Sequence, residues 1–133
     1  MRFIKPVSYI IGISQLVLGG LFLLVPAGFI GWQGLTPPPA DNGYMYAMLA
    51  ARFLVYGVGM FVIARDPVRH MFWARGMVAI QIIDFLAGLT YVGIGLVQPS
   101  AAMLPMTNAA IFAAFLFLSL RAAAPQRAQG AAQ

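Results

Sequence analysis

The chain has 133 residues, of which 62% are hydrophobic and 8% charged, and its formal net charge is +5. A soluble domain carries about 25% charged residues, so this composition excludes an ordinary soluble enzyme, a disordered protein and a nucleic-acid binder. The lack of cysteine excludes a disulfide framework, a cysteine-ligated metal site and a thiol nucleophile. One histidine and three acidic residues leave few groups for acid–base chemistry.

Stretches long enough to cross a membrane dominate the chain. A helix needs about 20 mostly apolar residues to cross the roughly 30 Å hydrocarbon core of a bilayer. Four stretches meet this requirement, at residues 6–30, 44–64, 71–97 and 100–120. We therefore predict an all-α fold, an integral-membrane four-helix antiparallel bundle over residues 1–121. The Ala- and Gln-rich remainder, residues 122–133, is predicted to be a disordered cytoplasmic tail.

The distribution of basic residues predicts the orientation of the spans. Seven of the eight fall on one predicted side of the membrane: Arg2, Lys5, Arg65, Arg69, Arg75, Arg121 and Arg127. The positive-inside rule places that side in the cytoplasm, so we expect an N-in/C-in multi-pass protein of the bacterial inner membrane. Contact with lipid headgroups accounts for the net charge, and no nucleic-acid partner is needed.

A cleaved signal peptide is the alternative interpretation of the first span. Arg2 and Lys5 resemble the basic start of such a peptide. The apolar stretch after them is longer than the about 7–15 residues typical of a signal peptide, so we favour a retained span.

The connection between the second and third spans has the sequence Ala64-Arg65-Asp66-Pro67. Asp66 is a favourable N-cap and Pro67 a favourable first helical residue. We therefore expect the third helix to begin at Pro67 and the two spans to form a tight helical hairpin.

Two charges lie inside the predicted spans, Arg52 in the second and Asp84 in the third. An unpaired charge at mid-bilayer costs about 2.5–3.5 kcal/mol on insertion scales. Counted from the connection, Arg52 lies roughly 21 Å along its helix and Asp84 roughly 25 Å along the next. An arginine side chain can bridge that difference, so we predict a buried Arg52–Asp84 ion pair between the two helices.

Further polar side chains near mid-span are candidates for the same site, namely Gln15, Tyr56, Gln81 and Tyr91. By helical spacing, Gln81 and Tyr91 share the stripe of Asp84, and Tyr56 lies one turn from Arg52. Together these residues are predicted to form one polar centre that serves as a buried ion pair or a ligand-binding site. The alternative is that polar and small residues only hold the membrane helices together.

Two methionine pairs lie near the outer ends of their predicted helices, Met45/Met48 and Met103/Met106. Thioethers suit Cu(I), although methionine is also a common apolar filler, so a copper site is left open. His70 stands alone, and a bis-histidine haem would need its second ligand from another chain. We assign no catalytic residue, no metal site and no cofactor from the sequence.

Several short sequence features define the layout of the chain. Pro26-Ala27-Gly28 ends the first span, Ala51-Arg52-Phe53 lies inside the second, and the basic connection leads to Asp84. In this layout the chain resembles the DoxX-like and BphX-like group of small four-helix bacterial membrane proteins. One branch of that group resembles a subunit of a thiosulfate–quinone oxidoreductase, which implies contact with quinone. No redox cofactor motif is present here, so the resemblance does not extend that activity to this chain.

These observations support three hypotheses for function. The first is a non-catalytic accessory or scaffold subunit of an inner-membrane assembly, with other membrane chains or further copies of itself as partners. The second is a binder of a small amphipathic ligand (a quinone, a lipid or an organic acid) held at Arg52. The third and weakest is a component of a proton or ion pathway that uses Asp84.

Overall fold

The computed structural model describes the backbone of residues 4–130 and the side chains of residues 4–122. Within this range every regular element is helical: α1 (Ile4–Leu24), α2 (Pro26–Trp32), the 3-10 helix η1 (Ala40–Asn42), α3 (Gly43–Arg65), α4 (Met71–Gly93) and α5 (Pro99–Gly130). Four of these helices, α1, α3, α4 and α5, are long and apolar enough to cross a membrane. The prediction of four spans is confirmed at this level of length and composition.

The first span is shorter than predicted. Helix α1 ends at Leu24, and Pro26 begins the separate seven-residue helix α2. Between them Val25 has φ −140° and ψ 50°, outside the helical region, because a following proline disfavours the helical conformation. The predicted single helix over residues 6–30 is therefore wrong at its end.

The connection between α3 and α4 is longer than predicted. Helix α4 begins at Met71, and residues 66–70 form turns ahead of it. Asp66 stabilises this turn, because its Oδ1 accepts a hydrogen bond from the backbone N–H of Arg69 at 3.1 Å. The predicted helix start at Pro67 is therefore wrong, and so is Asp66 as the N-cap of that helix, because His70 is at the N-cap position of α4 and Asp66 caps the turn before it.

The third and fourth spans also differ from their predicted ends. Helix α4 stops at Gly93, and Gly95 follows with φ +76°, a left-handed conformation that glycine adopts without strain. Helix α5 continues to Gly130, so the prediction of a disordered tail from residue 122 is wrong over residues 122–130. Residues 131–133 of that predicted tail lie outside the described residues.

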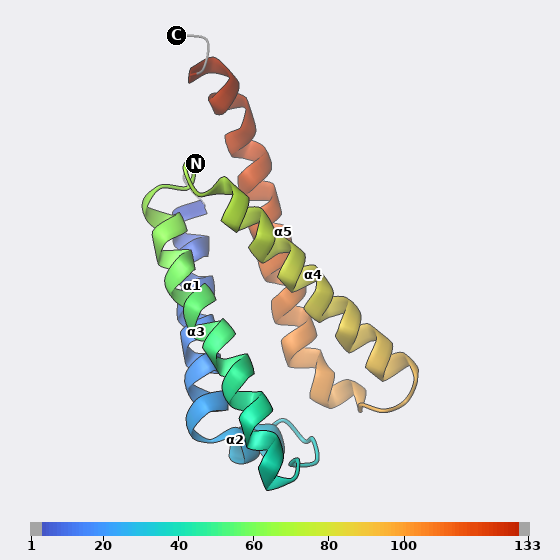
Figure 1. The fold of residues 1–133 in the computed structure, drawn as a ribbon. Helices are drawn as coiled ribbons and strands as arrows, with labels where there is room; N and C mark the ends of the chain where they lie inside the picture. The colour runs from blue at the N-terminus through green and yellow to red at the C-terminus, as the bar shows by residue number, and fades with distance from the viewer. Residues whose placement is uncertain (1–3, 131–133) are drawn as a thin grey trace.

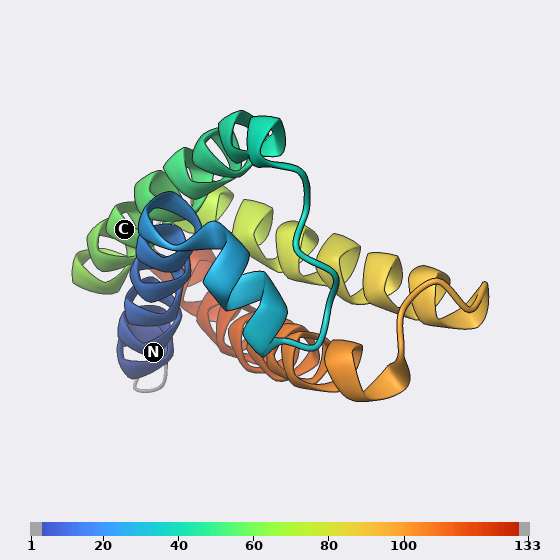
Figure 2. The same cartoon turned by 90° about the horizontal axis from the view of Figure 1, so that it is seen from below.

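The four long helices pack as two pairs. Helix α1 lies against α3, and α4 lies against α5, while contacts between the pairs are fewer. We call α1–α3 the first arm and α4–α5 the second arm. The arms meet near the start of α1 and the α3–α4 turn and diverge toward their other ends (Figure 1). Seen from below, the end of α4 (yellow) and the start of α5 (orange) extend away from α1 and α3 (Figure 2).

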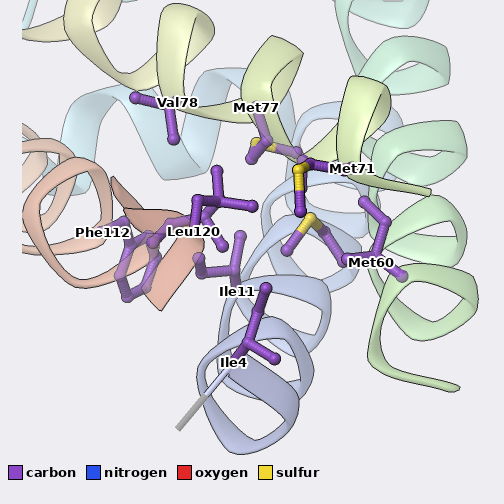
Figure 3. Close-up of a cluster of buried hydrophobic side chains, with 11 residues drawn as sticks. Ile4, Ile11, Met60, Met71, Met77, Val78, Phe112 and Leu120 are labelled. Carbon is purple, nitrogen blue, oxygen red and sulfur yellow. The ribbon is translucent and has the colours of Figure 1, made fainter. Parts of the chain in front are cut away.

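Among the residues whose side chains are described, the four long helices share one core, and it lies at this junction. The core contains residues from both arms (Figure 3): Ile4, Ile11, Met60, Ile63, Met71, Ala74, Met77, Val78, Phe112, Leu116 and Leu120. Ile4, Met60, Ala74 and Leu116, one from each helix, are completely buried. The junction therefore fixes the arms relative to each other.

Close packing inside the first arm depends on glycine. A Cβ atom added at Gly12 would lie 3.1 Å from the carbonyl oxygen of Gly57, and one added at Gly57 would lie 2.8 Å from Cγ of Leu16. Small residues let membrane helices approach closely, where packing replaces the hydrophobic drive that lipid removes. At the far end of this arm the Phe22 ring packs on Phe29, Tyr46 and Phe53, with ring centroids 5.2–5.8 Å apart.

We expect the substitution Gly12→Leu to push α1 away from α3, because its Cβ meets backbone that cannot move aside. Overpacking of this kind costs about 1–3 kcal/mol. Gly20→Leu, on the same helix, is the matched control, since a Cβ there has nothing within 4 Å. Thermal unfolding in detergent should show a lower midpoint for Gly12→Leu alone. Equal midpoints for the two variants would contradict the close α1–α3 contact.

Candidate functional site

A cavity of about 570 Å³ lies between α3 and α4, where the arms begin to separate. Its wall on α3 includes Arg52, Tyr56, Gly59 and Met60. The opposite wall includes His70, in the turn before α4, and Trp73 and Met77 of α4. Met60 and Met77 also belong to the core of the junction. The cavity is therefore bounded by the junction at one end and by Arg52 near the middle of α3.

Arg52 and Asp84 lie at matching positions on the two arms. Arg52 is 13 residues before Arg65, the last residue of α3, and Asp84 is 13 residues after Met71, the first residue of α4. Each charge is therefore about 20 Å along its helix from the junction, at 1.5 Å per residue. Both residues would lie well inside the hydrocarbon core if the helices span it.

The two charges are nevertheless not paired with each other in the single chain. Arg52 and Asp84 are both exposed, and among the described residues no side-chain hydrogen bond or ion pair joins them. The predicted buried Arg52–Asp84 pair is therefore not formed within the chain. The reason is the divergence of the arms, which separates α3 from α4 with increasing distance from the junction.

Asp84 belongs to the face of α4 that lines the cavity. Trp73, Met77, Asp84 and Tyr91 follow one another at spacings of four, seven and seven residues, which keeps them on one stripe of a helix. Trp73 and Met77 line the cavity, so Asp84 and Tyr91 extend the same face toward the open end. The exposed part of this stripe, at Asp84 and Tyr91, together with the Arg52 side of α3, is called the open face below.

The remaining predicted site residues separate into different environments. Tyr56 is partly buried in the cavity wall, and Tyr91 is exposed. Gln15 and Gln81 are buried, 5% and 3% exposed, and the Gln81 amide donates to Sδ of Met77 at 3.7 Å. The structure therefore brings Arg52 and Tyr56 together in one cavity, but it does not gather all six predicted residues in one polar centre.

Two cavity residues, His70 and Trp73, are absent from the site predicted from the sequence. That prediction treats His70 as a lone interfacial histidine and gives Trp73 no role at a site. Their spacing to Met77, seven and four residues, places all three on one face of α4 and the turn before it, and this spacing is visible in the sequence. The sequence does not show that this face looks onto α3.

The methionine pairs lie on different arms. Met45 and Met48 begin α3 on the first arm, whereas Met103 and Met106 begin α5 on the second. Met106 packs toward Gly88 of α4, where an added Cβ would meet its Cγ at 2.5 Å. One chain therefore does not bring the four thioethers together. Among the described residues no group of three or more His, Cys, Asp or Glu could hold a metal ion.

Comparison with known protein families, with curated proteins and with solved structures finds no match to this chain. The resemblance to the DoxX-like and BphX-like group is not tested by this result and stays a prediction.

Cysteine labelling tests the placement of the polar residues, because the natural chain has no cysteine. We expect Arg52→Cys and Asp84→Cys to react readily with a membrane-permeant maleimide in detergent. Gln15→Cys and Gln81→Cys should react on the order of tenfold more slowly, since labelling there requires local opening of the packed arms. Equal rates at all four positions would contradict the exposure of the two charges.

Proposed function

We propose that this chain is a non-catalytic subunit of a multi-chain assembly in the bacterial inner membrane. The observation that carries the proposal is the exposure of Arg52 and Asp84 near mid-span. Charges at the centre of a bilayer cost about 2.5–3.5 kcal/mol each on insertion scales, and in membrane proteins they face a protein interior or a water-filled cavity. A partner chain on the open face would supply the environment that the single chain lacks.

The low burial of α4 supports the same proposal. Only 17% of its most apolar stretch is buried inside the chain, against 28% for each of the other three spans. Helix α4 packs mainly on α5, so much of its remaining surface is available to other chains. Because Asp84 lies on this exposed helix, a covering chain would also provide the environment that a mid-span charge requires.

The proposed orientation is N-in/C-in, with the four spans crossing the membrane in alternating directions. Five basic residues are exposed around the junction: Lys5, Arg65, Arg69, Arg75 and Arg121. These five residues lie at one end of the molecule. If the junction faces the cytoplasm, their position agrees with the positive-inside rule. Anionic lipid headgroups would then attract this end of the molecule.

Native mass spectrometry after gentle extraction from the host membrane tests the proposal. We expect a complex of more than one chain. Arg52→Gln and Asp84→Asn should each lower the assembled fraction at least about tenfold, because each leaves a buried partner charge unpaired. Asp41→Asn, which removes an exposed charge outside the long helices, is the matched control and should leave assembly unchanged. A lone chain for the natural sequence would contradict the proposal.

The cavity favours a second candidate function, the binding of a small amphipathic ligand. A volume of about 570 Å³ lies within the about 300–1,000 Å³ typical of small-molecule sites. Most of the lining is apolar, and Arg52, Tyr56 and His70 supply the few polar groups that would orient a ligand. The Arg52 guanidinium would donate to a carbonyl or carboxylate of a quinone, a lipid or an organic acid.

Filling the cavity tests this second candidate. An added Cβ at Gly59 meets nothing within 4 Å, so Gly59→Leu should occupy the cavity without unfolding the helix. In a Trp32→Phe background, a short-chain quinone should quench Trp73 fluorescence in the otherwise natural chain, because Trp73 lines the cavity. Gly59→Leu should weaken that binding at least about tenfold. Gly20→Leu should have no effect, and unchanged quenching in Gly59→Leu would contradict ligand binding here.

A further inference from the structure

We infer that the chain on the open face is a second copy of this chain, held by two reciprocal ion pairs. In each pair Arg52 of one copy meets Asp84 of the other. The inference rests on the proposed function and names the partner that the proposed function leaves open.

The distribution of charge on the open face carries this inference. The face holds one positive and one negative residue, Arg52 on α3 and Asp84 on α4, each exposed and each about 20 Å from the junction. A two-fold axis along the membrane normal places Arg52 of one copy level with Asp84 of the other, and the reverse contact is then formed automatically. Two pairs result, and they satisfy both Arg52 and Asp84 in each copy.

The direction of the helices is compatible with this contact. Helix α3 leads into the junction and α4 leads out of it, so the two run in opposite directions along the arms (Figure 1). A two-fold axis along the membrane normal preserves this relation between α3 of one copy and α4 of the other. The side chains that precede and follow the two charges then meet in register.

Small residues beside both charges permit close approach. Ala51 precedes Arg52, and Gly59 lies two turns along the same side of α3 with open space around it. On α4, Ala87 lies one turn from Asp84 and is exposed. Membrane helix interfaces are enriched in small residues of this kind, because they bring backbones within packing distance. The open face therefore combines opposite charges with surfaces that allow two helices to touch.

Charge reversal provides a test in which neither of two variants should form a dimer alone, but a mixture of the two should. Arg52→Asp carries two acidic residues on the open face, and Asp84→Arg carries two basic residues. Each variant alone would bring like charges together and should lose dimer affinity by about a hundredfold. Mixed, the two variants place an acidic residue opposite a basic residue in both pairs. We therefore expect a heterodimer of differently tagged chains, measured by pull-down and by native mass spectrometry.

Insertion into the membrane is checked first by the amount of each variant in the membrane fraction. If a reversed charge prevents insertion, Arg52→Gln and Asp84→Asn replace the reversals. Each neutral variant should then lose most of its dimer. A mixture of the two should recover part of it, because the mixed dimer keeps one Arg52–Asp84 pair and brings the two neutral side chains together at the other position. Dimers that persist in the neutral variants would overturn the inference.

Other outcomes separate this inference from the proposed function. Single reversals that still dimerise, or inserted reversals that stay monomeric when mixed, overturn the second copy as partner. If Arg52 and Asp84 instead pair within one chain when the arms close, the mixed single reversals would also stay monomeric. A chain that carries both reversals would then be a stable monomer. A complex of the natural chain with different chains, lost in Arg52→Gln, would overturn the second copy and leave the proposed function standing. A lone natural chain would overturn both.

Discussion

One cluster of buried side chains at the junction determines how the rest of the molecule is arranged. Ile4, Met60, Ala74 and Leu116 come from four different helices and are completely buried there. Away from the junction each helix packs mainly on its own partner, α1 on α3 and α4 on α5. In lipid, no hydrophobic force draws the two arms together, so close packing and polar contacts decide where they touch. The junction has that close packing, and the outer parts of the arms diverge.

The divergence explains why Arg52 and Asp84 are exposed. Both lie about 20 Å from the junction along their helices, beyond the reach of the shared core. In water such an arrangement would be ordinary, because a charge at a protein surface is hydrated. In a bilayer the same exposure is costly, since hydrocarbon offers neither water nor counter-charge. This difference between water and lipid is the basis for the proposal that a partner chain covers the open face.

The sequence predicts the properties that depend on local residues. Four spans and the mid-span position of both charges are predictable from apolar length and from counting along a helix. The break at Val25 is not part of the predicted span over residues 6–30, although the restriction that Pro26 places on the residue before it is a signal for it in the sequence. The pairing of the helices is not predictable in this way. It depends on how Gly12, Gly57 and their neighbours fit in three dimensions, and hydropathy carries no information on that fit.

For the two mid-span charges, too, the sequence predicts their position along the helices but not which groups they meet in three dimensions. Counting along the helices predicts nearly the same depth for Arg52 and Asp84, and the structure gives them equal distances from the junction. Matching depth is therefore a sound basis for expecting the two charges to pair, but it does not decide whether the pair forms within one chain or between two. Within one chain the arms diverge; between two chains the same depth would bring each charge to its counterpart. A costly pair of charges also discourages other neighbours, because a partner without the opposite charges at that depth would leave both unpaired. On this proposal Arg52 and Asp84 act on the choice of partner more than on the stability of the single chain.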